Sequence, residues 1–225
     1  MSLVKLTDTP PFSYTSRKLA SAMEMERVFD PAFCNSDDPP EDPKYATYYD
    51  GLEELTFIER NTNNYPERRP DMLCISVDGA CSNNGYGNDR ASAGVFFGPQ
   101  SRHNWSGVLN RNTHLQTNQS AETFAMIQAL SIFNQNRSEY PWDEIHTIVI
   151  VTDSDYAFRG ITSHVDEWRR SGYTHRNGEA VVNGDNFRQL DSLIGDLEVD
   201  GIDVVFWKVD PEFNQKADGL ARSEL

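Results

Sequence analysis

The chain has 225 residues, of which 38% are hydrophobic and 24% are charged, a composition that suits one globular domain with an extension or two small domains. Twenty Lys and Arg residues against 35 Asp and Glu residues give a net charge of −15. This balance excludes a protein held to nucleic acid by a general basic surface, and it argues against docking on an anionic membrane.

The sequence contains neither an apolar run of about 18 residues nor the apolar core of a signal peptide, so we expect no membrane partner and a cytoplasmic or nuclear location. The cysteines Cys34, Cys74 and Cys81 are odd in number and lack the CxxC spacing of a zinc site. We therefore interpret them as the reduced thiols of a reducing compartment.

Residues 1–70 are predicted to form an acidic, Pro-containing N-terminal extension, partly helical or disordered, ahead of a folded domain. The segment CNSDDPPEDPK at 34–44 combines prolines with acids and cannot bury enough apolar surface to order itself. Apolar patches at 21–33 and 48–60 predict short helices, and residues 61–71 predict a linker. The extension is either an interaction arm or a cover for one edge of the domain, and we favour the cover.

The domain at residues 71–225 is predicted to be a mixed sheet covered by helices. Short runs rich in β-branched and aromatic residues predict strands at 73–77, 92–98, 103–109, 146–152 and 203–209. Runs of helix-forming residues predict helices at 121–133, 156–160, 162–170, 185–198 and 214–225. Antiparallel strands followed by strands that alternate with helices indicate an α/β fold.

Four acidic residues stand at the ends of these elements. Asp78 and Asp153 directly follow apolar strands, and Glu122 and Asp218 are expected in the first turns of helices. Because sites gather at the carboxyl ends of strands, parallel neighbours would place Asp78 beside Asp153. Carboxylates that converge without Lys or Arg repel one another unless a cation neutralises them, and oxygen ligands alone favour Mg²⁺ or Mn²⁺. Taken singly, each acid is also explained as a cap or as a partner of a helix dipole.

Four segments occur in the order of the type 1 ribonuclease H family: VDGACSNNG at 77–85, TNQSAETFAMIQAL at 117–130, VTDSDY at 151–156 and NQKADGLA at 214–221. From about Leu73 onward the chain resembles this family. The resemblance implies a ribonuclease H-like fold, a five-stranded mixed sheet of three antiparallel and then two parallel strands flanked by helices. It also implies an endonuclease that hydrolyses the RNA strand of RNA/DNA hybrids by a two-metal-ion mechanism.

In such a mechanism two Mg²⁺ ions, for which we expect Mn²⁺ to substitute, activate the attacking water and stabilise the leaving oxygen. By motif position, Asp78, Glu122, Asp153 and Asp218 resemble the family's catalytic carboxylates, which also bind the metal ions. The implied partner is an RNA/DNA hybrid, and we expect the protein to act as a monomer.

Five polar residues resemble the family's substrate contacts near these carboxylates. Asn84, Asn118 and Gln119 match positions that contact the 2′-hydroxyls and base edges of RNA, and the 2′-hydroxyl is what distinguishes RNA from DNA. Thr117 and Asn183 match polar positions of the family's DNA-phosphate pocket. Turn and helix-cap chemistry explains Asn84, Asn118 and Gln119 equally well.

Trp168, Arg169 and Arg170 form the one place in the sequence where cations and aromatic residues interleave, with Arg176 further along. This segment resembles the family's basic protrusion, which grips the DNA strand. The alternative is that two arginines at the end of a helix complement the negative end of its dipole.

The chain departs from the family pattern in three respects. The loop at 207–214 is shorter than usual and lacks the family's histidine. Leu115 stands where a basic residue is common, and His164 stands where an aromatic residue is common. The first 70 residues contain no recognisable hybrid-binding domain. Together these departures predict weak hybrid binding. The missing histidine predicts a loss of rate rather than of chemistry, because the metals and not the histidine activate water.

Three functional hypotheses stay open on the sequence. The first, which the presence of all four carboxylates favours, is an active ribonuclease H with a reduced grip on its substrate. The second is a catalytically silent or weak ribonuclease H-like module that binds nucleic acid or protein. The third is a related two-metal nuclease or a structured-RNA-cutting enzyme on the same fold, because a fold does not determine a substrate.

Overall fold

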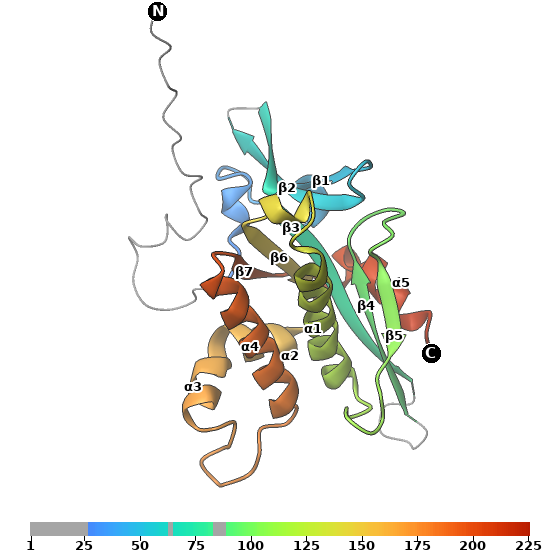
Figure 1. Ribbon diagram of the computed structural model, residues 1–225, viewed down its shortest axis with the longest axis vertical. Helices are drawn as coiled ribbons and strands as arrows, with labels where there is room; N and C mark the ends of the chain where they lie inside the picture. The colour runs from blue at the N-terminus through green and yellow to red at the C-terminus, as the bar shows by residue number, and fades with distance from the viewer. Residues whose placement is uncertain (1–26, 63–64, 83–88) are drawn as a thin grey trace, which may run out of the picture.

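The computed structural model describes residues 27–62, 65–82 and 89–225, in which one sheet is packed against several helices (Figure 1). The strands are β1 (Thr47–Asp50), β2 (Leu55–Thr62), β3 (Tyr65–Ser82), β4 (Arg90–Phe96), β5 (Trp105–Val108), β6 (Thr147–Thr152) and β7 (Asp203–Lys208). Strands β1 to β5 pair in sequence order and antiparallel, whereas β6 runs parallel to both β3 and β7. The predicted five-stranded mixed sheet is confirmed in β3 to β7, and β1 and β2 extend it.

Strand β6 lies inside the sheet, and all six of its residues are buried. Ile148 and Ile150 point into a core that also contains residues of the helices, whereas Val149 and Val151 point into a second core on the opposite face. Burial on both faces explains why this strand is a continuous apolar run rather than an alternating one.

The helices are α1 (Asn118–Asn136), α2 (Asp155–Arg159), α3 (Val165–Arg170), α4 (Gly184–Val199) and α5 (Gln215–Arg222), with a π-helix at Gly160–His164. Short 3₁₀-helices lie at Pro31–Phe33, Pro43–Tyr45, Trp142–Glu144 and Pro211–Phe213. Helix α1 packs on β3, β4 and α4, and α5 packs on β3 and β4. Within the described ranges, none of the helices combines the length and the apolar character needed to cross a membrane.

Helix α1 begins three residues earlier than its predicted start at Ala121. The side chain of Thr117 caps it by accepting a hydrogen bond of 3.2 Å from the backbone nitrogen of Ser120, so the first helical residue is Asn118. Glu122 therefore lies in the second turn of the helix, and the expectation that it lies in the first turn is wrong.

Residues 27–71 differ most from the sequence-based expectations. The helix predicted at 48–60 is wrong, because these residues form most of β1 and β2, in which buried Leu55 and Phe57 flank the partly exposed Thr56. The predicted linker at 61–71 is the end of β2 and the start of β3, so residue 70 lies inside a strand. The start of β2 is apolar, with Leu55, Phe57 and Ile58 buried, whereas residues 59–62 and 65–71 are polar and at least partly exposed, which leaves little hydrophobic periodicity to recognise there.

The chain from residue 27 to residue 46 covers the second face of the sheet. Of the helix predicted at 21–33, residues 21–26 lie outside the described part, and the remainder forms a bridge between Val28 and Phe206 and then a 3₁₀-helix. Phe29, Cys34 and Ala46 are buried in the second core. In Figure 1 this blue segment lies beside the sheet, close to β6 and β7.

Candidate active site

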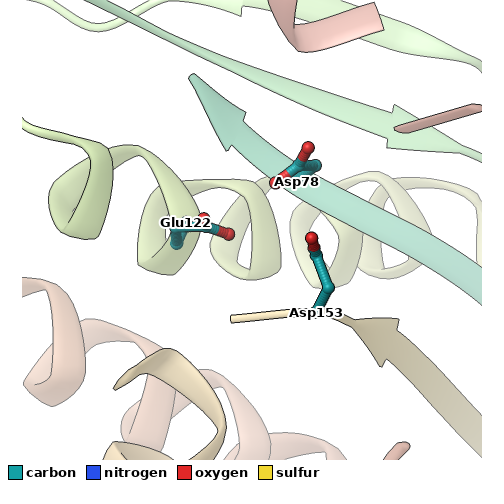
Figure 2. Close-up of side chains that lie close together, drawn as sticks. All are labelled: Asp78, Glu122 and Asp153. Carbon is teal, nitrogen blue, oxygen red and sulfur yellow. The ribbon is translucent and has the colours of Figure 1, made fainter. Parts of the chain in front are cut away.

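Asp78 and Asp153 are brought together by the parallel pairing of β3 and β6. Ser76 pairs with Val151, so each acid lies two residues beyond this pair on its own strand. Strand β3 continues to Ser82, and Asp78 therefore lies within the strand rather than at its end. Figure 2 shows the side chains of Asp78, Asp153 and Glu122 converging from β3, from the end of β6 and from α1.

The approach of α1 to β3 depends on Gly79. A Cβ atom at this position would lie 2.2 Å from the backbone nitrogen of Glu122, a distance that no side chain can tolerate. Glycine therefore lets the helix lie directly on the strand, and this contact places Glu122 next to Asp78. One oxygen each from Asp78, Glu122 and Asp153 lies within 4.8 Å of the others. We call these three residues the acidic cluster.

Asp218 lines the same hollow as the acidic cluster. Gly94 makes this possible, because a Cβ atom there would lie 2.5 Å from the carbonyl oxygen of Ala217 and would block α5 from β4. The oxygen of Asp218 accepts a hydrogen bond of 2.5 Å from Arg222, one turn further along α5. The expectation that the four acids converge without an arginine is therefore wrong for Asp218.

The electrostatics of the cluster are those of buried, mutually repelling acids. Asp78 is 5% exposed and Glu122 is 7% exposed. Burial, and then the charge of Asp153, raise the pKa of Asp78 from 3.8 to about 7, although the backbone N–H of Gly79 donates to it at 2.8 Å and partly offsets the rise. Burial and the charge of Asp78 raise the pKa of Glu122 well above its usual value.

The donor set fits a divalent cation. One oxygen of Glu122 accepts a hydrogen bond of 3.1 Å from Asn118, but its Oε2 is buried and has no hydrogen-bond partner in the described part of the chain. A buried carboxylate oxygen without a donor costs free energy unless a cation or water contacts it. The cluster offers oxygen ligands only, which hard cations such as Mg²⁺ prefer.

Asn214, which was not predicted from the sequence, supports the cluster through hydrogen bonds to β3 and to Asp153. Asn214 is 1% exposed, and its Nδ2 donates to the carbonyl oxygen of Val77 at 2.9 Å and to Oδ1 of Asp153 at 2.8 Å. It therefore connects the strand that bears Asp78 to the side chain of Asp153. Asn214 begins the segment NQKADGLA, and its place directly ahead of the helix that carries Asp218 was the available signal.

The predicted RNA-contacting and phosphate-contacting residues lie in different environments. Asn118 contacts Glu122 and lines the hollow of the site, whereas Gln119 is exposed on the first turn of α1. Thr117 is engaged as the helix cap. Asn183 precedes α4 in a left-handed conformation, and its Nδ2 donates to the hydroxyl of Tyr156 at 3.1 Å. Asn84 lies outside the described residues.

The residues predicted to form the basic protrusion differ in their contacts within the protein. Trp168 packs on Phe187 with ring centroids 4.9 Å apart. Arg169 is held by the carboxylate of Asp191 at 2.6 Å, so its charge is already neutralised within the protein. Arg170 is exposed at the end of α3, with no ion pair to any residue in the described ranges. The two arginines, which were predicted to have the same role, therefore differ in the structure: Arg169 is paired with an acid and Arg170 is exposed.

The loop between β7 and α5 contains a 3₁₀-helix at Pro211–Phe213 and no histidine. Together, the fold and the site define an α/β domain with an oxygen-ligand site for a cation at the centre of its sheet. The comparisons with known proteins agree with this class of protein.

The sequence profile described as RNase H matches residues 70–225. Ribonuclease H1 of Rattus norvegicus is 30% identical over 190 residues, which cover 83% of this chain and 60% of that protein. Ribonuclease H1 of Homo sapiens is 32% identical over 169 residues, or 73% of this chain and 53% of that protein. The chain belongs to the RNase H family, which confirms the type 1 ribonuclease H resemblance.

Solved structures agree on the fold. The crystal structure of LC9-RNase H1, a type 1 RNase H with the type 2 active-site motif, is 20% identical, has a TM-score of 0.50 and covers 68% of this chain and 71% of that one. A foamy viral protease–reverse transcriptase in complex with RNA/DNA hybrid is 21% identical, has a TM-score of 0.51 and covers 72% of this chain and 21% of that one. The chain spans no more than 60% of the length of the rat and human ribonuclease H1 proteins.

Proposed function

We propose that this protein is an endonuclease that hydrolyses the RNA strand of RNA/DNA hybrids with the help of two divalent cations, Mg²⁺ or Mn²⁺. The observation that supports this proposal is the acidic cluster, in which two buried acids have raised pKa values and one oxygen of Glu122 has no partner among the described residues. The family adds support, since the relatives are named ribonuclease H1 and one structural neighbour was solved with RNA/DNA hybrid.

The residues that would hold the cations are Asp78, Glu122, Asp153 and Asp218. When bound, divalent cations supply Lewis acidity that activates water and stabilises the leaving oxygen of a phosphodiester. The chain itself orients the ligands: Gly79 donates to Asp78, Asn118 donates to Glu122, and Asn214 donates to Asp153. These hydrogen bonds keep three carboxylates in place before any cation or substrate arrives, which lowers the cost of reorganisation.

Substrate recognition would use groups on both sides of the cluster. Asn118 lies in the hollow beside Glu122, where its amide could contact a 2′-hydroxyl of RNA. Trp168 and Arg170 lie on α3, where an aromatic ring and an exposed cation would support the DNA strand. We further propose that the protein is a monomer of the cytoplasm or nucleus, in keeping with the unpaired thiols of Cys34 and Cys74.

The decisive experiment compares hydrolysis of an RNA/DNA hybrid, double-stranded RNA and double-stranded DNA by the same preparation, with Mg²⁺ and with Mn²⁺. We expect cleavage of the RNA strand of the hybrid alone, and none in the presence of EDTA. If the hybrid stays intact with both metals but still binds, the protein is instead a silent binding module. Cleavage of double-stranded RNA at a similar rate would favour a structured-RNA nuclease. Light scattering would test the monomer.

A further inference from the structure

Asp191 of α4 is a buried carboxylate that two arginines from distant parts of the chain share. It is 8% exposed. Arg169 of α3 donates to Oδ1 at 2.6 Å and to Oδ2 at 2.8 Å, and Arg27 donates to Oδ1 at 3.1 Å. The hydroxyl of Tyr173 donates to Oδ2 at 3.3 Å. We call these four residues the Asp191 clamp; it joins the start of the described chain, α3, α4 and the loop after α3.

Arg27 is itself held firmly. Its guanidinium makes two further hydrogen bonds to Glu198, each of 3.2 Å, and Glu198 lies two turns after Asp191 on α4. Its backbone carbonyl accepts a hydrogen bond of 2.8 Å from Phe206 of β7. Arg27 therefore connects the edge of the sheet to two points on α4, and it cannot leave Asp191 without breaking this connection.

Helix α3 is joined to α4 in part by the clamp. It has only six residues, and a π-helix precedes it, so it has little intrinsic stability. Its contacts with α4 include the packing of Trp168 on Phe187 and the ion pair of Arg169 with Asp191. The side chain of Arg169 is 51% exposed, and an arginine that faces water keeps one orientation only when its acceptor is rigid.

The surface beside α3 is suited to a nucleic-acid strand. A hollow there is lined by Trp168, Ser171, His175, Arg176 and Asn177, among others, and Arg170 is exposed at the end of the helix. Bases stack on aromatic rings and phosphates bind exposed cations, and both contacts require the ring and the cation at a defined distance.

We propose that Arg27 is a positioning residue for substrate binding: by sharing Asp191 with Arg169, it fixes α3 and so sets the position of Trp168 and Arg170. Arg27 lies ahead of residues 70–225, which match the family profile. The segment that contains Arg27 then strengthens substrate binding without contacting the substrate. Arg169 holds both oxygens of Asp191, and Arg27 adds a further donor on Oδ1 that ties the same carboxylate to β7 through the backbone of Arg27. This inference rests on the proposed function for the identity of the substrate.

The test compares Arg27→Ala and Arg27→Lys with a matched control, Arg137→Ala. Arg137 forms an ion pair with Asp200 beyond the end of α4, and neither residue belongs to the clamp. Steady-state hydrolysis of the hybrid gives KM and kcat, and hydrogen exchange of residues 165–176 reports on α3 and its loop. We expect Arg27→Ala to raise KM roughly two- to tenfold, to leave kcat within about twofold and to speed exchange in residues 165–176. Arg27→Lys, which cannot bridge Asp191 and Glu198 with paired donors, should lie between wild type and Arg27→Ala.

The inference is overturned if Arg27→Ala leaves both KM and exchange at wild-type values, or if Arg137→Ala changes them equally. A fall in kcat with an unchanged KM would also overturn it, because that pattern belongs to the acidic cluster. If wild type does not cleave the hybrid at all, the proposed function fails, and unchanged exchange in Arg27→Ala would still reject the clamp separately. A thermal-unfolding measurement identifies any variant that fails to fold, and Arg27→Lys then decides.

Discussion

The protein contains two buried acidic sites, the acidic cluster of Asp78, Glu122 and Asp153 and the clamp centred on Asp191, which are built from the same chemical group. In the cluster, burial and mutual repulsion raise the pKa values of Asp78 and Glu122. Burial alone would also raise the pKa of Asp191, but hydrogen bonds from Arg169 and Arg27 outweigh it and hold the pKa below its usual range.

This difference in pKa distinguishes a site that can bind a further ligand from one whose carboxylate is already paired within the protein. Asp191 has all the donors it needs within the chain, so its role is structural. The cluster has three acids and an oxygen of Glu122 that lacks a partner among the described residues, so it still has room for a ligand such as a cation. Perturbed acids without partners are typical of functional sites, whereas paired acids are typical of supports.

The largest effect is expected from Asp78→Asn, which removes a ligand from the centre of the cluster. We expect hydrolysis of the hybrid to fall about a thousandfold or more. The metal-free protein should be at least as stable as wild type, because a repulsive buried charge is removed. Asp155→Asn is the matched control, since Asp155 is exposed and paired with Arg159. A loss of stability in Asp78→Asn that matched its loss of activity would contradict the assignment.

Asn214→Ala tests whether the cluster needs the hydrogen bond from Asn214 to Asp153. We expect a fall in activity or in Mg²⁺ affinity of about 10- to 100-fold, because Asp153 loses the donor that orients it. Titration calorimetry with Mg²⁺ measures the affinity, and Gln215→Ala, at the exposed neighbouring position, is the control. An unchanged Mg²⁺ affinity together with unchanged activity would remove Asn214 from the site.

Asp191→Asn should have the opposite signature to Asp78→Asn. It leaves Arg169 and Arg27 without their shared charge, so we expect the free energy of unfolding to fall by about 1–3 kcal/mol. Mg²⁺ affinity should not change, since the clamp contains no residue of the cluster. Urea unfolding and calorimetry on the same preparation make the comparison, and a gain in stability would show that Asp191 is not a support.

The two sites should also respond to pH in opposite directions. The pKa of Asp78 rises from 3.8 to about 7 on folding, so the folded metal-free protein holds this proton more tightly than the unfolded chain. Its contribution to stability is therefore lost as the pH rises from 3.8 to about 7. The contribution of Asp191, whose pKa is lowered, is present above the usual Asp pKa and is lost as the pH falls through the lowered value.

Mg²⁺ competes with the protons of the cluster, so its affinity should increase between about pH 6 and pH 8. The rise in melting temperature on adding Mg²⁺, measured at several pH values, tests this expectation. The same series on Asp78→Asn should be flatter. A wild-type response that does not vary with pH would show that no group of the cluster titrates in this range.

The smallest effect on hybrid binding is expected from substitution of the two arginines of α3, which were predicted to form one basic protrusion. Arg170→Ala should reduce the slope of log affinity against log salt concentration by about one, as the loss of one phosphate contact does. Arg169→Ala should leave the slope unchanged, because Asp191 already neutralises its charge, and should weaken binding only through α3. Binding of a fluorescent hybrid at several salt concentrations compares them, and equal slopes in both variants would reject the division.

The sequence alone was sufficient to predict five of the seven strands and the acids that lie together in the cluster, and the reason is local. The short, mostly apolar runs before Asp78 and Asp153 indicate buried strands, and parallel neighbours place the residues that follow such runs side by side. It also predicted the acids of α1 and α5 from their motifs, although not the turn in which Glu122 lies. Strands β1 and β2 were missed, because the apolar residues at the start of β2 were interpreted as part of a short helix and the residues after them show no alternating pattern.

What only the tertiary structure decided is which charges meet. Arg27 and Asp191 are 164 positions apart, and Asn214 reaches Val77 across 137. No spacing in the sequence distinguishes Arg169, which is paired with Asp191, from Arg170, which forms no ion pair with the residues that the structure describes. The sequence determined which acids could form a cation site; the packing of α4 and α5 on the sheet determined which acids are paired and which are left for a cation, because a buried charge is defined by its neighbours in space.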